Sequence, residues 1–143
     1  MVKLFDKYIF PEGLYYSKDH LWVKIEDGRV RIGITDLAQQ ATGNVLLFMA
    51  MPKGRILEYG KTLGTIETEK KVRHLKSPIT GKILEVNDIL KKRPMLLNND
   101  PYGEGWIVVV QPTKLDIEIS NLMNTEEQLQ PFVELEGPKI NLS

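Results

Sequence analysis

Alternation of apolar and polar residues gives the first clear structural signal in this sequence. Val30, Ile32 and Ile34 are separated by single arginine and glycine residues, which is the period of a strand with one buried face. A second apolar segment precedes them, and Asp27-Gly28 lies between the two. Because Asp-Gly readily adopts the positive φ angles of a tight turn, the pattern predicts a β-hairpin over residues 21–34.

Further strands are predicted where short apolar segments lie between turn residues. They cover residues 44–51, 61–68, 72–76, 82–86 and 106–110. The first and last of these are almost continuously apolar, which predicts buried strands.

Helices are predicted in two places. Asp36 with Gln39 three positions later resembles a capping box at the start of a short helix, and Gly43 suits its end. Beyond position 115 the apolar period becomes helical, and Thr125 with Gln128 can cap a further helix.

The predicted fold is therefore mainly β, a compact barrel or sandwich with short helices and a helical C-terminal appendage. Its organisation is an N-terminal arm over residues 1–13, a single domain over 14–134 and a C-terminal tail over 135–143, which is expected to be loose from Gly137 onward.

Composition narrows the function classes. The chain has 143 residues with 19 basic and 19 acidic side chains, so no overall positive field attracts nucleic acid or an anionic membrane. Its longest apolar run, residues 45–51, is too short to cross a bilayer. Cysteine is absent, which excludes disulfide frameworks, thiolate nucleophiles and most structural zinc sites. We expect a cytoplasmic protein.

Candidate catalytic chemistry is sparse. The only histidines are His20 and His74, no serine occupies a GxSxG context, and no ligand spacing suggests a metal. The glycines around Glu104 precede a predicted strand, which is the wrong order for a phosphate-binding turn. We therefore expect a protein that is not an enzyme.

The triplet Glu69-Lys70-Lys71 falls between two predicted strands and therefore at a hairpin tip. Such a charged tip is most often an ordinary solvated turn. The alternative is that a tip lysine is a modification site, where an amide on the long stem would form a mobile tether on a rigid scaffold.

The sequence around this tip, and nearly the whole chain, resembles the glycine cleavage system H-protein family of lipoyl carriers. The motifs that show the resemblance are Tyr16-Ser17-Lys18-Asp19-His20 with Trp22, Gly33-Ile34-Thr35-Asp36, Ser77-Pro78 with Gly81, Glu85-Val86-Asn87, and Asn98 with Asp100-Pro101-Tyr102-Gly103 and Gly105-Trp106. The resemblance implies a lipoyl-type barrel-sandwich hybrid fold.

The resemblance also implies that Lys70 is the attachment site of lipoic acid. Glu67 lies three residues before it as in the family, and Thr68 takes the usual serine position, so both are expected to be read by a lipoate-protein ligase or lipoyltransferase. Lys71 departs from the pattern, which prefers a small residue. The implied partners are a pyridoxal-phosphate glycine decarboxylase, an aminomethyltransferase and dihydrolipoyl dehydrogenase.

Two further departures concern the cargo. The resemblance implies an arm cleft at Asp19, Leu21 and His74, and in the family the last two positions are usually acidic and help to hold the aminomethyl cation. Leucine cannot pair with an ammonium, and a protonated histidine repels it. The alternative is an H-like lipoate-binding protein that carries sulfur intermediates for a heterodisulfide-reductase-like sulfur-oxidation complex. A third possibility is an unmodified scaffold that only binds a partner.

Overall fold

The computed structural model describes residues 2–5 and 7–138. Its strands are β1 (Val2–Phe5), β2 (Tyr8–Pro11), β3 (Tyr15–Tyr16), β4 (Leu21–Glu26), β5 (Arg29–Ile34), β6 (Leu47–Ala50), β7 (Ile56–Leu57), β8 (Thr62–Glu67), β9 (Val72–Lys76), β10 (Gly81–Val86) and β11 (Val108–Pro112). Its helices are α1 (Asp36–Thr42), α2 (Ile89–Lys92), α3 (Leu96–Asn99), α4 (Leu115–Glu118), the 3-10 turn η1 (Ile119–Asn121) and α5 (Glu126–Glu136).

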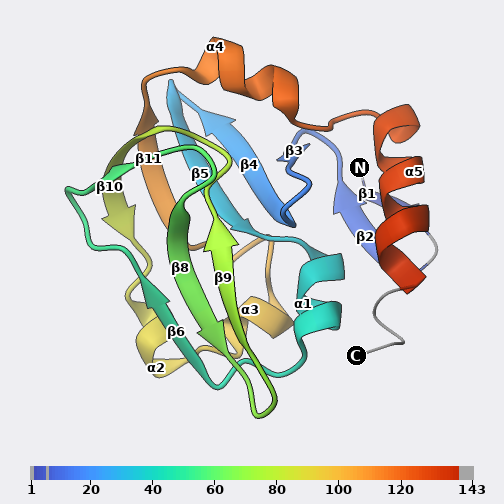
Figure 1. Cartoon of the computed structure of the whole chain (residues 1–143), viewed down its shortest axis with the longest axis horizontal. Helices are drawn as coiled ribbons and strands as arrows, with labels where there is room; N and C mark the ends of the chain where they lie inside the picture. Colours follow the sequence, from blue (N-terminus) through green and yellow to red (C-terminus); the bar gives the residue numbers. More distant parts are fainter. Residues whose placement is uncertain (1, 6, 139–143) are drawn as a thin grey trace.

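Two sheets form the body of the protein (Figure 1). The larger has six strands in the order β3-β4-β5-β11-β10-β7, and the smaller has three in the order β6-β8-β9. One core cluster contains buried side chains from both, including Ile32 and Val108 of the larger sheet and Phe48 and Leu75 of the smaller. The fold is therefore mainly β and sandwich-like, not a closed barrel, as the sequence predicted in outline.

The predicted hairpin over residues 21–34 is confirmed as β4 and β5, which pair in antiparallel register. Leu21 lies opposite Ile34 at the open end, and Glu26 lies opposite Arg29 beside the turn. Asp27 and Gly28 have φ angles of 50° and 79°. Two successive positive φ angles match the right-handed twist of the flanking strands, which is why Asp-Gly is favoured there.

Two predicted strands differ from the structure. Residues 44–51 do not form a fully buried strand: β6 covers only 47–50 at the edge of the smaller sheet, and Met49 is 64% exposed while Phe48 is buried. An edge strand with one face in solvent needs only every second side chain to be apolar, so the apolar run was misleading. The strand predicted from residue 106 begins at Val108, and Trp106 is instead half-buried beneath the Arg31 guanidinium.

Helix ends are set by local hydrogen bonds. Thr125 and Gln128 form the predicted capping box of α5. At α1 the cap is Thr35, not Asp36, because the Thr35 hydroxyl accepts the backbone N–H of Ala38 (3.0 Å). Asp36 already belongs to the helix, and its carboxylate accepts from the Gln39 amide (2.8 Å).

Both ends of the described chain pack on one edge of the sandwich. A second cluster joins side chains of β2 to α5, and Tyr8 and Phe10 are each 1% exposed. At the start of the predicted C-terminal tail, α5 continues to Glu136, and the Tyr8 hydroxyl donates to the Gly137 carbonyl (3.3 Å), so Gly137 is held against β2. Residues 139–143 of that tail lie outside the described residues.

Truncation of the central strand should destabilise the domain. Val108 is fully buried in β11, between β5 and β10, and we expect Val108→Ala to lower the free energy of unfolding by about 1–3 kcal/mol because it leaves a cavity. Val72→Ala is the matched control, since Val72 is 56% exposed, and its effect should stay within about 0.5 kcal/mol. Equal midpoints and slopes in urea for Val108→Ala and the parent would contradict a core position for β11.

Candidate functional site

The tip of the β8–β9 hairpin is a four-residue turn organised by Thr68. The Thr68 backbone N–H donates to the Lys71 carbonyl (2.9 Å), and the Thr68 hydroxyl accepts from the backbone N–H groups of Lys70 (3.3 Å) and Lys71 (3.2 Å). A short hydroxyl side chain is suited to this bonding to residues two and three positions ahead. Thr68 therefore fixes the backbone that presents both lysines.

The two tip lysines differ in their surroundings. The Lys71 ammonium donates to the carbonyl of Ala41 (3.3 Å) in the last turn of α1, where orphan carbonyls attract a cation. Lys70 is exposed, and within the described residues its ammonium has no hydrogen bond or ion pair. Glu67, at the end of β8, is also exposed.

A groove of about 470 Å³ lies beside Lys70, between the tip and the C-terminal end of α1. It is lined by residues 40–44, Leu46 and the tip residues 68–71. Asn98 holds one wall in place, because its amide group donates to the Gly43 carbonyl (2.7 Å) and accepts the Val45 N–H (2.9 Å). The groove is thus built by elements that are distant in the sequence.

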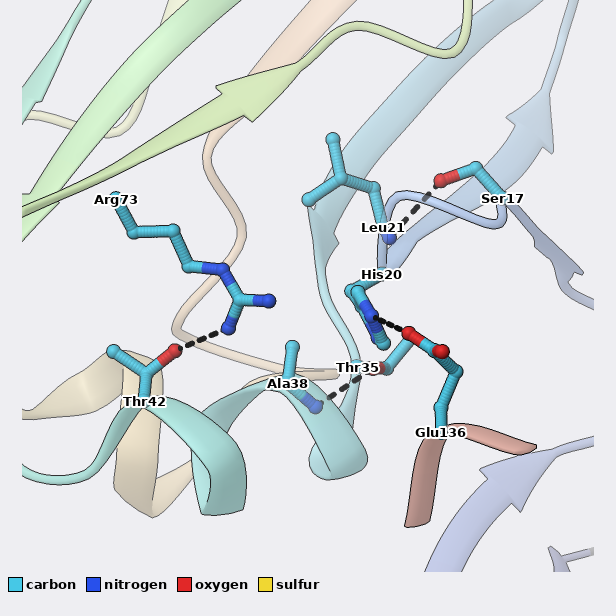
Figure 2. A network of polar contacts seen from close by, with 8 residues as sticks. All are labelled: Ser17, His20, Leu21, Thr35, Ala38, Thr42, Arg73 and Glu136. Carbon is cyan, nitrogen blue, oxygen red and sulfur yellow. Dashed lines mark hydrogen bonds and ion pairs between the residues drawn. The ribbon is translucent and has the colours of Figure 1, made fainter. Parts of the chain in front are cut away.

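A polar network lies on the inner side of α1 and β9 (Figure 2). His20 Nε2 bonds to Glu136 Oε1 of α5 at 2.8 Å, and Arg73 Nη1 of β9 donates to the Thr42 hydroxyl of α1 at 2.9 Å. In Figure 2 the Arg73 guanidinium extends from β9 toward the His20–Glu136 pair. One hydrogen bond thus links the turn before β4 to α5, and the other links β9 to α1.

Burial is the main cause that lowers the pKa of His20, and the charge of Arg73 lowers it further, against the opposing effect of Glu136. Because a carboxylate can only accept, the Nε2 atom carries the proton of the neutral ring. Nδ1 is buried, and none of the described residues gives it a hydrogen-bond partner. A second proton there would have no acceptor, so the neutral ring is the stable form.

Burial also lowers the pKa of Arg73, and Glu136 partly offsets this effect. A guanidinium nevertheless stays protonated in proteins. The network therefore contains a permanent cation, a carboxylate and a neutral imidazole.

The three predicted cleft positions occupy different environments. Leu21 is fully buried in the main core, opposite Ile34, and Asp19 is exposed in the turn before β4. His74 is exposed on the outer face of β9, with its Nδ1 atom 3.2 Å from the Thr65 hydroxyl. The structure does not unite these side chains in one cluster.

Sequence reasoning missed Arg73 and Glu136. Strand alternation was the signal available for Arg73, because an exposed His74 and Val72 require residue 73 to face inward. Nothing local marked Glu136, whose partner lies 116 residues away.

Comparison with known proteins identifies the family. The profile of the "Glycine cleavage H-protein" family matches residues 14–134. The chain belongs to the glycine cleavage H-protein family. Members of this family are lipoyl carriers without catalytic activity of their own, which confirms the resemblance found in the sequence.

Individual relatives agree with this assignment. The glycine cleavage system H protein of Coprothermobacter proteolyticus is 42% identical over 120 residues, covering 83% of this chain and 94% of that protein. The glycine cleavage system H protein 4 of Aquifex aeolicus is 37% identical over 130 residues, covering 91% and 75%. The crystal structure of a glycine cleavage system H protein from Mycobacterium marinum superposes with a TM-score of 0.77 at 32% identity, covering 90% of this chain and 99% of that one.

Among the described residues, no group of three or more His, Asp or Glu side chains is arranged to hold a metal ion. None of the described helices combines the length and apolar character needed to span a bilayer.

The lowered pKa of His20 predicts a pH-dependent stability. Between this lowered pKa and the ordinary value of 6.5, the unfolded chain binds more protons than the folded one, so the free energy of unfolding falls as the pH falls through that interval. His20→Gln keeps an amide donor for Glu136 but does not titrate. In urea melts at about pH 7.5 and about pH 5.5, we expect the variant to lose less stability on acidification than the parent. Identical losses would show that His20 does not contribute to the acid sensitivity.

Proposed function

We propose that this protein is a lipoyl carrier whose arm is attached to Lys70. The observation that supports this assignment is the contrast at the hairpin tip, where Lys70 is exposed and Lys71 is bonded to the end of α1. A modifying enzyme needs an amine that is accessible from all sides. The turn between the paired strands β8 and β9 holds the Lys70 amine in such a position.

The residues present fit a lipoyl group. Thr68 holds the turn, Lys70 supplies the amine, and the groove of about 470 Å³ beside it offers a surface on which an arm can rest. When attached, the group supplies a reducible disulfide that takes up and releases a transferred unit. The contribution of the chain is to hold the arm at one edge, to position it beside α1 and to offer contacts for the enzymes it visits.

The outer face of the smaller sheet suits such contacts. Leu47, Met49 and Val72 are 43%, 64% and 56% exposed on this face, next to the tip. Apolar side chains gathered in solvent are typical of a surface that binds other proteins. We propose that this face binds the lipoate-attaching enzyme and the enzymes that exchange units with the arm.

The family favours the glycine cleavage system as the setting of this carrier. In that role the arm takes the aminomethyl group from a pyridoxal-phosphate decarboxylase and passes it to an aminomethyltransferase, and dihydrolipoyl dehydrogenase reoxidises it. The second candidate is a carrier of sulfur intermediates, and a specific observation favours it: Leu21 is apolar and buried, and Arg73 brings a cation to the inner side of the tip.

Lys70→Arg should abolish lipoylation, and Lys71→Arg should leave it intact. The protein is incubated with a lipoate ligase and lipoic acid, and intact mass and peptide mapping report the modified residue. The two substitutions are matched, since each keeps a cation and removes one amine from the tip. Modification that persists in Lys70→Arg and disappears in Lys71→Arg would assign the arm to Lys71, and an unmodified parent would favour the scaffold alternative.

Thr68→Val should slow lipoylation by about tenfold, because the backbone N–H groups of Lys70 and Lys71 lose the acceptor that holds the turn. Each of these hydrogen bonds contributes about 0.5–1.5 kcal/mol. Thr68→Ser keeps the hydroxyl and should react at close to the parental rate. Initial rates with a lipoate ligase measure the effect. If valine reacted as fast as serine, the hydroxyl would not be needed for recognition of the tip.

A further inference from the structure

The C-terminal end of α1 carries no cation of its own. This helix has Asp36 in its first turn and no basic residue in its last turn. The last carbonyls of a helix have no partner within it and attract positive charge. Cationic donors from another part of the chain are therefore favoured at this end of α1.

The β8–β9 hairpin supplies two such donors. Lys71 Nζ donates to the Ala41 carbonyl at 3.3 Å. Arg73 Nη1 donates to the hydroxyl of the next residue, Thr42, at 2.9 Å (Figure 2). Lys71 and Arg73 are two positions apart along an extended segment, so their side chains leave it on the same side, and Val72 between them is exposed. We call this pair of contacts the α1 clamp.

The α1 clamp affects the two tip lysines differently. Both belong to the turn held by Thr68, and both are exposed. The amine of Lys71 can react only after it has left the Ala41 carbonyl. For Lys70 no such bond has to break, because its ammonium has no hydrogen bond or ion pair within the part of the chain that the structure describes.

We propose that the α1 clamp determines which of the two tip lysines receives the arm. Lys71 is withheld by its contact with α1, and Lys70 is left as the acceptor. This inference rests on the proposed attachment of lipoic acid to Lys70. A tip with two adjacent lysines offers two amines of the same chemistry, and the clamp gives them different surroundings.

The step that the clamp controls is the formation of one amide bond. A neutral lysine amine attacks the carbonyl carbon of a lipoyl adenylate, the bond from this carbon to the phosphate oxygen breaks, and adenylate leaves. The nitrogen gives up one proton to water, and no electrons are exchanged. Because the nitrogen lone pair makes the new bond, an ammonium that is donating to a carbonyl cannot take part.

A small acylating reagent tests the clamp without an enzyme. The protein that has not yet been lipoylated is treated with limiting acetic anhydride, and fragment masses after cleavage at glutamate give the acetylated fractions of Lys70 and Lys71. We expect Lys71 to react about two- to fivefold more slowly, the range of a cation bound at a helix C-terminus. Lys76, exposed at the far end of β9, is the internal reference.

Thr42→Val opens one point of the clamp without changing the tip. Valine has nearly the shape of threonine and no hydroxyl for Arg73, so the hairpin is held less firmly on α1. We expect acetylation of Lys71 to rise by about two- to threefold relative to Lys76, the size of effect of a partly exposed polar contact. Thr42→Ser keeps the acceptor and should behave like the parent. The matched control is Thr62→Val, at an exposed position at the start of β8, which should leave the ratio unchanged.

The same variants are then incubated with lipoate ligase and lipoic acid. We expect the parent and Thr42→Ser to be modified at Lys70 alone and Thr42→Val to carry part of its lipoyl groups on Lys71. A parent that stays unmodified at Lys70 would contradict the proposed function, and the acetylation ratio still reports on the clamp.

Two results would overturn the inference. One is equal acetylation of Lys70 and Lys71 in the parent, or a ratio that Thr42→Val does not change. The other is lipoylation confined to Lys70 in a Thr42→Val protein whose Lys71 has become more reactive, because the enzyme would then select the lysine by its position alone.

Discussion

The close contact between Trp22 and Gly33 is the constraint on which the arrangement of α1 beside the hairpin tip depends. The two residues are paired across β4 and β5, and a Cβ added at Gly33 would lie 2.6 Å from the indole ring. The indole therefore lies flat on the strand, and its N–H donates to the Pro101 carbonyl (2.9 Å). The adjacent Tyr102 hydroxyl accepts the N–H of Asp36 (2.9 Å), at the first residue of α1. Any side chain at position 33 would displace the ring, the loop and the start of α1 together.

This chain of contacts explains why several separated motifs identify the fold. The same Tyr102 hydroxyl donates to the Ile9 carbonyl of β2 (2.6 Å), and Asn98 fixes the loop that follows α1. These residues perform no chemistry. They hold separate segments of the chain together by hydrogen bonds, and these bonds fix the position of α1 beside the hairpin tip. A carrier protein needs such rigidity because a flexible arm is recognised only if its base has a constant position.

The sequence predicted those features whose causes are local. The hairpin around Asp27-Gly28 and the capping box at Thr125 depend on neighbouring residues, and the structure has both. The start of α1 was placed on Asp36 and not on Thr35, because both side chains can cap and only the tertiary context chooses between them. Burial of β6 was overestimated because an apolar run does not reveal whether a strand lies at a sheet edge.

The site was predictable at its tip and not in its interior. Lys70 could be singled out by the motif around it, although its modification stays a prediction. The network of His20, Arg73 and Glu136 depends on contacts between distant elements, which a single sequence does not report. Leu21 illustrates the difference: family resemblance placed it at a cleft, whereas the structure places it in the main core.

The position of Glu136 near the end of the chain has a consequence for the order in which parts of the fold form. Its bond to His20 spans 116 residues, whereas the hairpin that presents Lys70 closes between neighbouring strands. During synthesis the hairpin leaves the ribosome before α5, because it lies nearer the N-terminus. A nascent chain can therefore present the tip before Glu136 is available to His20. Formation of the tip and closure of the network of His20, Arg73 and Glu136 are thus separable steps in the folding of the protein.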